Sequence, residues 1–259
     1  MNGPDTGAEL PPTDDLLARQ IAYYRAHAPM YDDWWFRRDR YDLGDAFRLG
    51  WETEIAAVQA FLDDLGGLGE VLELAGGTGN WTAELVGRAD GVTVVDAAPE
   101  AVAIARDKVA GPVEWLIADI FEFRPTRRYD TVFFSFWLSH VPEHRFDEFW
   151  GLVAECVRPG GRVVFVDNAH PSHGRHVVPH RRFRWDGDAV GGTRVEGIDS
   201  VTNLKTGIST RTAADGDTYD IVKVWWEPDA LQARLGELGW EFHVALTDWA
   251  FLYGHGTRT

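Results

Sequence analysis

The sequence predicts an α/β protein whose mostly parallel sheet is covered by helices on both faces. Short apolar runs alternate with helical patterns between residues 70 and 167. The runs are apolar throughout rather than at every second residue, which is typical of strands buried on both faces. The chain has 259 residues and an apolar share of 45%, enough for one sizeable core. We therefore expect one domain over residues 14–259.

Charge and cysteine content exclude several kinds of partner. Lys and Arg number 25 against 41 Asp and Glu, and the formal net charge of −16 repels a polyphosphate backbone or an anionic bilayer. No apolar run is long enough to cross a membrane, and the acidic, proline-broken N-terminus is unlike a signal peptide. We expect a cytoplasmic protein that binds neither nucleic acid nor membrane, with the single cysteine, Cys156, buried.

The N-terminal part combines a disordered segment with two helices. Residues 1–13 are rich in Pro, Gly, Asp and Thr and are expected to be disordered. Two helices follow within residues 14–65. Apolar side chains recur at helical spacing in the first, which we expect to end near Pro29, because the residue before a proline disfavours helical geometry. The second is predicted over residues 45–65, where a glycine pair stops it.

The alternation of strand and helix follows, and a cap interrupts it. We expect strands at 70–74, 92–95, 113–117, 131–136 and 163–167, helices at 80–88, 99–109 and 143–157, and a turn at 158–161. Residues 168–207 lack periodicity and are too long for a plain connection, so they predict either a cap over one sheet edge or a disordered insertion.

A hairpin and two closing strands complete the expected sheet of seven strands. Residues 210–226 hold two β-rich arms around Asp215-Gly216, so the inserted cap with its hairpin spans 168–226. A helix over 228–238 and strands over 241–246 and 249–253 end the domain.

The most informative motif is a predicted strand that runs into a glycine turn and then a helix, with the sequence VLELAGGTGN from Val71 to Asn80. Glycines permit positive φ and close approach of a ligand, and the helix start offers unpaired N–H groups. Glu73 precedes the turn and places negative charge there, which suits the cationic amino group of a methionine moiety better than a phosphate. The turn also lacks the spacing of the dinucleotide fingerprint, which disfavours a nicotinamide oxidoreductase.

Two further acids follow neighbouring strands. Asp96 ends the next strand, where such folds place an acid that accepts hydrogen bonds from ribose hydroxyls. Asp119 and its apolar neighbour Ile120 follow the strand after that and suit an adenine amine and ring. With Glu73, these acids lie at the carboxyl ends of predicted parallel strands, where open α/β sheets bind ligands.

Together, the glycine string, the acids, the 158–161 turn and the closing strands resemble class I S-adenosylmethionine-dependent methyltransferases over residues 14–254. The resemblance implies their Rossmann-like fold, S-adenosylmethionine as cofactor and S-adenosylhomocysteine as product. It also implies that the turn contacts the methionine part. Ala75 replaces the usual first glycine, a mild departure where φ is negative. The implied cofactor contacts are Glu73, Ala75, Gly77, Gly79, Asp96, Ala97, Asp119, Ile120 and Ser135.

A closer resemblance covers residues 23–32, 133–142 and 219–224. These segments are similar to actinobacterial small-molecule O-methyltransferases, which include the phosphonate O-methyltransferase of dehydrophos biosynthesis. In that group the N-terminal helix covers the cofactor, which implies lid contacts from Tyr24 and Tyr31, with Tyr31 also facing the substrate. Aromatic core packing is the alternative role. The resemblance points to secondary metabolism and is compatible with a homodimer, and the longer cap predicts a different acceptor.

Two hypotheses concern the methyl acceptor. An ionised carboxylate or phosphonate needs only positioning, which Arg211 and Lys223 would supply by their resemblance to cationic hairpin positions of that group. Both side chains share a face only with a three-residue loop over 214–216, which we predict. Solvated edge-strand charges are the alternative. A hydroxyl or amine would instead need a base, for which His140 is the candidate, unless it only starts a helix.

Other activities remain as alternatives. One is methyl transfer to nitrogen or carbon of a natural product with His140 as base, and another is a non-catalytic protein that binds S-adenosylmethionine. A loop cluster of histidines invites a metal hypothesis, but its spacing lacks a paired acid pattern, so we expect no metal site. The cluster comprises His170, His173, His176 and His180.

Overall fold

The computed structural model describes residues 13–170, 173, 184–186, 194–197, 200–203 and 206–259. Apart from Thr13, where the first helix begins, the prediction of disorder for residues 1–13 lies outside these residues. None of the described helices combines the length and apolar character needed to cross a lipid bilayer.

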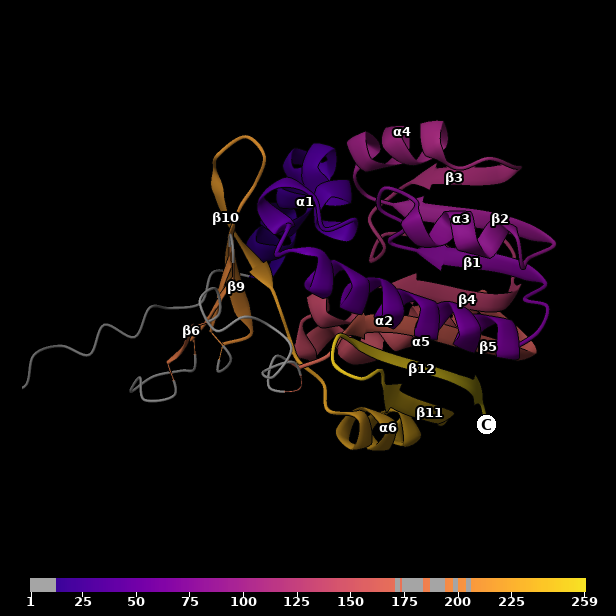
Figure 1. Cartoon of the computed structure of the whole chain (residues 1–259). Helices are drawn as coiled ribbons and strands as arrows, with labels where there is room; N and C mark the ends of the chain where they lie inside the picture. Colours follow the sequence, from indigo (N-terminus) through magenta and orange to yellow (C-terminus); the bar gives the residue numbers. More distant parts are fainter. Residues whose placement is uncertain (1–12, 171–172, 174–183, 187–193, 198–199, 204–205) are drawn as a thin grey trace, which may run out of the picture.

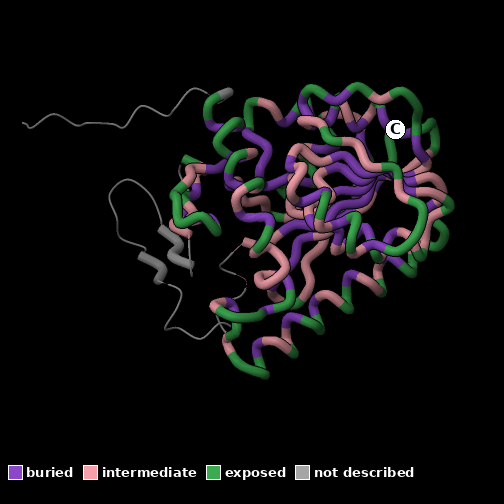
Figure 2. Tube along the Cα trace, turned by 90° about the horizontal axis from the view of Figure 1, so that it is seen from above, coloured by how far each residue is buried: buried purple, intermediate pink, exposed green. Residues whose placement is uncertain are grey.

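The predicted seven-stranded sheet is confirmed, and β12 runs antiparallel to its other six strands (Figure 1). From one edge to the other the strands are β11 (Trp240–Leu246), β12 (Phe251–Arg258), β5 (Val157–Asn168), β4 (Tyr129–Ser135), β1 (Glu70–Leu74), β2 (Gly91–Asp96) and β3 (Val113–Ile117). The central strands are buried and apolar because helices cover both sheet faces, as Figure 2 shows from above.

Within the described ranges, six helices and three short 3-10 turns surround the sheet. The helices are α1 (Thr13–Trp35), α2 (Asp45–Asp64), α3 (Asn80–Val86), α4 (Pro99–Lys108), α5 (Phe146–Cys156) and α6 (Pro228–Glu237). The turns are η1 (Asp39–Tyr41), η2 (Leu138–His140) and η3 (Glu143–Arg145). Side chains of α2 and α3 pack in the cluster on one sheet face, and those of α5 and α6 in the cluster on the other. Cys156 is buried, as predicted.

The cap is a second, antiparallel sheet rather than an irregular excursion. Its strands follow the order β10 (Thr218–Val222), β9 (Ile208–Thr212), β8 (Ser200–Asn203), β7 (Arg194–Gly197) and β6 (Arg184–Asp186). The strands β6 to β8 have three or four residues each, too few to produce a recognisable alternation in the sequence. The described residues of 168–207 therefore include short strands that the sequence pattern did not indicate.

Helix α1 does not end near Pro29 but continues through it to Trp35. Proline removes one intrahelical N–H donor, which disfavours this course. The turns beyond it carry two tryptophans whose rings lie 5.5 Å (Trp34) and 6.1 Å (Trp35) from the ring of Trp51 on α2. Burial of these aromatic rings offsets the missing hydrogen bond. Tertiary packing therefore sets the end of α1 and extends it over the edge of the sheet where the strands end.

Candidate functional site

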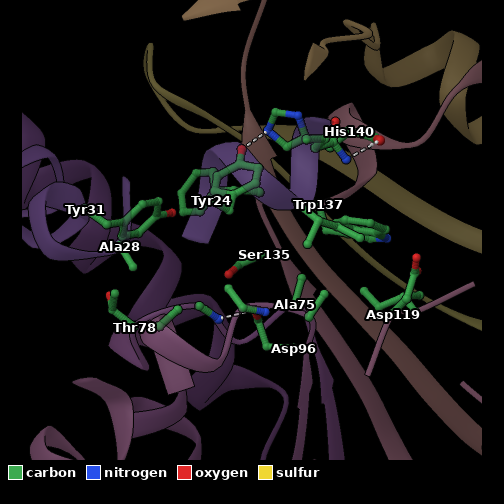
Figure 3. A pocket seen from close by; sticks show the side chains of 18 of the residues that line it. Tyr24, Ala28, Tyr31, Ala75, Thr78, Asp96, Asp119, Ser135, Trp137 and His140 are labelled. Atoms are coloured by element: carbon green, nitrogen blue, oxygen red, sulfur yellow. Dashed lines mark hydrogen bonds between the residues drawn. The ribbon is translucent and has the colours of Figure 1, made fainter. Parts of the chain in front are cut away.

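A cavity lies at the carboxyl ends of the parallel strands, beneath α1 (Figure 3). Helix α1 forms one wall, and the strand ends and the glycine turn form the other. The lining residues of α1 are Leu17, Gln20, Ile21, Tyr24, Ala28 and Tyr31. The others are Ala75, Gly77, Thr78, Asp96, Ala97, Ala98, Ala101, Asp119, Ile120, Phe121, Ser135, Phe136, Trp137 and His140. The cavity thus brings together most of the cofactor contacts expected from the sequence.

The glycine turn is braced by Asp96 at the end of β2. One carboxylate oxygen of Asp96 accepts the N–H of Gly77 at 2.8 Å, and the other accepts the N–H of Ala98 at 2.8 Å. Burial raises the pKa of Asp96. The backbone of Ala75 has a φ of +57°, so the expectation of a negative φ there is wrong. An L-residue is strained in this left-handed region, and the turn imposes this conformation on alanine.

Two expected cofactor contacts do not line the cavity. Glu73 is fully buried beneath the turn, where its carboxylate accepts the Thr82 hydroxyl at 2.5 Å. Burial raises the pKa of Glu73 to about 8, so negative charge is disfavoured there. Gly79, with a φ of +81°, packs against α4, and a Cβ there would lie 2.9 Å from the Ala105 side chain. The structure therefore places both residues behind the turn, where they support it.

Polar contacts fasten α1 to the glycine turn and to α4. Asp32 accepts hydrogen bonds from Lys108 Nζ at 2.8 Å, from the Thr78 hydroxyl at 2.7 Å and from the Asn80 amide at 3.1 Å. Burial alone would raise the pKa of Asp32, but these donors outweigh it and lower the pKa. We call these four side chains the Asp32 latch. The latch therefore ties α1, which lines the cavity, to the glycine turn and to α4.

Tyr24 and His140 meet at one end of the cavity (Figure 3). The Tyr24 hydroxyl lies 2.7 Å from His140 Nε2, and His140 Nδ1 lies 2.6 Å from the carbonyl oxygen of Val222 on β10. Gln20 fixes this arrangement, since its amide donates to the His140 carbonyl at 3.2 Å and accepts the Val222 N–H at 3.1 Å. Burial, followed by the charges of Lys223 and Arg211, holds the pKa of His140 well below its usual range.

Known proteins are similar to this chain in fold and in sequence. A model described as a methyltransferase domain matches residues 71–161. The structure of a DhpI–SAH complex is 34% identical, with a TM-score of 0.69, and the match covers 94% of this chain and 97% of that chain. The chain belongs to the class I S-adenosylmethionine-dependent methyltransferases.

More distant matches include an uncharacterized methyltransferase and a structure that shares the fold. An uncharacterized methyltransferase of Geobacillus kaustophilus is 30% identical over 100 residues, 38% of this chain and 46% of the relative. The chain spans about half to two thirds of the length of the curated relatives it matches. The structure of the CcbJ methyltransferase from Streptomyces caelestis shares the fold, with 16% identity and a TM-score of 0.61. That match covers 92% of this chain and 98% of the CcbJ chain.

The hairpin of the methyltransferase has the predicted three-residue loop. Thr212 pairs with Thr218, and the Ala213 N–H donates to the Asp217 carbonyl at 2.9 Å, which leaves residues 214–216 as the loop. Arg211 and Lys223 therefore face the same side of the hairpin.

Arg211 is half-buried against tyrosines. Its guanidinium lies 5.8 Å from the Tyr23 ring centroid, its Nε donates to the Ser209 hydroxyl at 3.4 Å, and its charge acts on Tyr23 and Tyr24. Within the part of the chain that the structure describes, no carboxylate forms an ion pair with it. A cation without a counter-ion beside the cavity favours an anionic ligand.

Lys223 has a different environment although it lies on the same face. It is fully buried, and its ammonium donates to the Ser139 hydroxyl at 2.8 Å and to the Asn168 side chain at 2.9 Å. Asp167 lies 3.7 Å away as its counter-ion. Burial lowers the pKa of Lys223 to about 8. An ammonium has three N–H donors, of which Ser139 and Asn168 accept two, and Asp167 balances its charge, so Lys223 is less available than Arg211 to an anionic ligand.

The histidine cluster lies only partly within the described residues. His173 contacts Glu227 at 3.1 Å, and the His170 ring lies 5.9 Å from that of Trp225. His176 and His180 lie outside the described residues. Among those that are described, no group of three or more His, Cys, Asp or Glu side chains could hold a metal ion.

Sequence reasoning missed Gln20, Asp32, Lys108 and Trp137. A signal for Gln20 was present, because Leu17, Gln20, Tyr24, Ala28 and Tyr31 follow one another at helical spacing along the cavity side of α1. A buried polar residue on an otherwise apolar helix face indicates a specific partner. Asp32 and Lys108 are far apart in the sequence, and only the packing of α1 on α4 brings them together.

Proposed function

We propose that this methyltransferase transfers the methyl group of S-adenosylmethionine to an oxygen of a small anionic molecule that Arg211 holds. The methylated oxygen belongs to a carboxylate, a phosphonate or a hydroxyl group of that molecule. The observation that carries the proposal is the guanidinium of Arg211, which has no carboxylate partner among the described residues and whose charge acts on Tyr24 in the cavity wall. A solved DhpI–SAM–HEP complex, 33% identical to this chain, supports the small-molecule acceptor.

The donor set of the cavity fits the proposed cofactor. Asp96 and Asp119 offer carboxylate oxygens for hydroxyl and amine donors, Ile120 offers an apolar face, and the turn at Gly77 admits close backbone approach. We infer that Asp96 holds the ribose, that Asp119 and Ile120 hold the adenine, and that the turn holds the methionine part. Tyr24 and Tyr31 cover the cofactor from α1. The bound cofactor supplies an activated methyl group on a sulfonium.

The protein's own contribution is alignment and exclusion of water. Transfer is an in-line displacement, so the nucleophile must be held on the axis of the bond that breaks. Helix α1 closes the cavity, and the apolar side chains around it exclude solvent from the reacting atoms.

The test combines binding with transfer. We expect calorimetry to detect S-adenosylhomocysteine binding, and a labelled-methyl assay to show transfer to anionic acceptors among carboxylates, phosphonates, phenols and amines. Replacing Arg211 with Met should raise the KM for the best anion about 10- to 100-fold without weakening S-adenosylhomocysteine binding, whereas Arg211→Lys should retain part of the affinity. Transfer only to neutral amines, or an unchanged KM in Arg211→Met, would contradict the proposal. Cofactor binding without any transfer would indicate a non-catalytic binding protein.

A further inference from the structure

Tyr24, His140 and the Val222 carbonyl form a chain of hydrogen bonds whose direction is fixed by the carbonyl, and Arg211 lies near Tyr24. The carbonyl can only accept, so His140 Nδ1, 2.6 Å away, carries the imidazole proton. His140 Nε2 is then bare and accepts the Tyr24 hydroxyl at 2.7 Å. Burial raises the pKa of Tyr24, which keeps the phenol protonated, and the positive charge of the nearby Arg211 opposes this shift. We call this set the Tyr24 chain.

The direction of the Tyr24 chain decides what Tyr24 offers to a ligand. Because its proton points toward His140, the oxygen presents lone pairs to the remaining space. An ionised oxygen placed against it would find no donor and would be repelled, whereas a hydroxyl could donate a hydrogen bond to it. Arg211 offers donors instead. The site therefore has one place for an anion and, adjacent to it, one place for an O–H group.

We propose that Tyr24 is a catalytic residue that takes the proton of a hydroxyl acceptor, with His140 as the base behind it. The acceptor class is then a small hydroxy acid, bound through its anionic group and methylated at its hydroxyl oxygen. This inference rests on the proposed function, in which Arg211 holds the anion, and it goes further by naming the oxygen that reacts.

The transfer step balances without another reactant. The acceptor oxygen forms a bond to the methyl carbon, and the carbon–sulfur bond breaks with its electron pair remaining on sulfur. The O–H proton moves to the Tyr24 oxygen while the proton of Tyr24 moves to His140 Nε2. His140 is buried, so after the methyl ether leaves, the proton on Nε2 returns to Tyr24 and one proton passes from Tyr24 to solvent through the emptied cavity. The net products are a methyl ether, a thioether and one proton.

The charges around His140 explain why the anion is needed. Arg211 and Lys223 both disfavour an imidazolium, while Asp167 partly offsets Lys223. An anion bound to Arg211 reduces this positive potential and makes His140 a stronger base. A neutral alcohol would lack this effect, so the anionic group serves both binding and proton removal.

The first experiment determines the direction of the Tyr24 chain without any substrate. Nitrogen-15 NMR of histidine-labelled protein bound to S-adenosylhomocysteine should show His140 as the neutral tautomer protonated at Nδ1. The Tyr24→Phe variant should shift the His140 Nε2 resonance, because the phenol no longer donates to it. A tautomer protonated at Nε2 would reverse the chain and overturn the inference.

The second experiment identifies the methylated oxygen. Lactate, 3-hydroxypropionate and salicylate are compared with the matched acids without a hydroxyl and the matched alcohols without an acid. We expect methyl ethers from hydroxy acids, with the matched compounds at least about tenfold slower. Methyl esters would overturn this inference and leave the proposed function intact. Absence of transfer to every acid, with S-adenosylhomocysteine still bound, would overturn both.

Variants then separate catalysis from packing. Tyr24→Phe and His140→Gln should lower kcat about 100-fold or more, with a smaller change in KM. Tyr219→Phe is the matched control, since it removes a tyrosine hydroxyl that donates to Asp215 on the exposed hairpin at 2.9 Å, away from His140. It should leave kcat within about twofold. An equal loss in all three variants, or a kcat in Tyr24→Phe close to that of the unmodified protein, would overturn the role of Tyr24.

Discussion

Replacing Ala75 with glycine should stabilise the protein, because Ala75 has a φ of +57° in the glycine turn. An L-residue pays about 1–2 kcal/mol for this left-handed geometry. Glycine loses that strain but gains freedom in the unfolded chain, which costs about 0.4–1 kcal/mol. The difference leaves about 0.5–1 kcal/mol of net stabilisation. For a domain of this size, Tm should rise by about 1–3 °C.

The matched control is the same substitution at Ala98, which also lines the cavity but has a φ of −99°. Ala98→Gly relieves no strain, removes a buried methyl group and adds unfolded-state freedom, so it should destabilise by about 1 kcal/mol. Denaturant unfolding and thermal melts of both variants, without ligand, measure the two free energies of unfolding. If Ala75→Gly is destabilised as much as Ala98→Gly, the left-handed strain assigned to the turn does not exist.

Three further predictions concern the supports of the cavity. Asp96→Asn should weaken S-adenosylhomocysteine binding about 10- to 100-fold in calorimetry, because an amide offers one acceptor oxygen for the two backbone N–H groups that Asp96 braces; undiminished affinity would contradict this role. Asp32→Asn and Lys108→Met should each speed S-adenosylhomocysteine dissociation several-fold in stopped-flow experiments, and the double variant should add little; additive effects would show that the two side chains act separately. Burial raises the pKa of Glu73 from 4.5 in the unfolded chain to about 8 in the folded protein. The resulting contribution to stability is fully present below pH 4.5 and is lost as the pH rises toward 8. The Glu73→Gln variant should therefore gain stability relative to the unmodified protein between pH 5 and 8, by at most about 1.4 kcal/mol per pH unit, and a constant difference in denaturant unfolding would contradict this.

The sequence alone was sufficient for the central sheet and for most of the cavity. Their signals are local: an apolar run, a glycine turn, and an acid such as Asp96 directly after a strand. Parallel strands carry their carboxyl ends to one edge, so residues marked in this way must converge once the strands pair. The three-residue hairpin loop was predictable for the same reason, because register and side-chain direction are linked by the twofold period of a strand.

Only the tertiary structure decided the features that depend on contacts between distant segments. The continuation of α1 past Pro29 depends on tryptophan packing against α2, and the burial of Glu73 depends on the helix that follows the turn. Lys223 and Arg211 are both cations in the sequence. In the structure, Asp167 at the end of β5 is the counter-ion of Lys223, whereas no described carboxylate pairs with Arg211. The availability of a charge depends on its neighbours in space, since ion pairing and desolvation act over a few ångströms without regard to chain order.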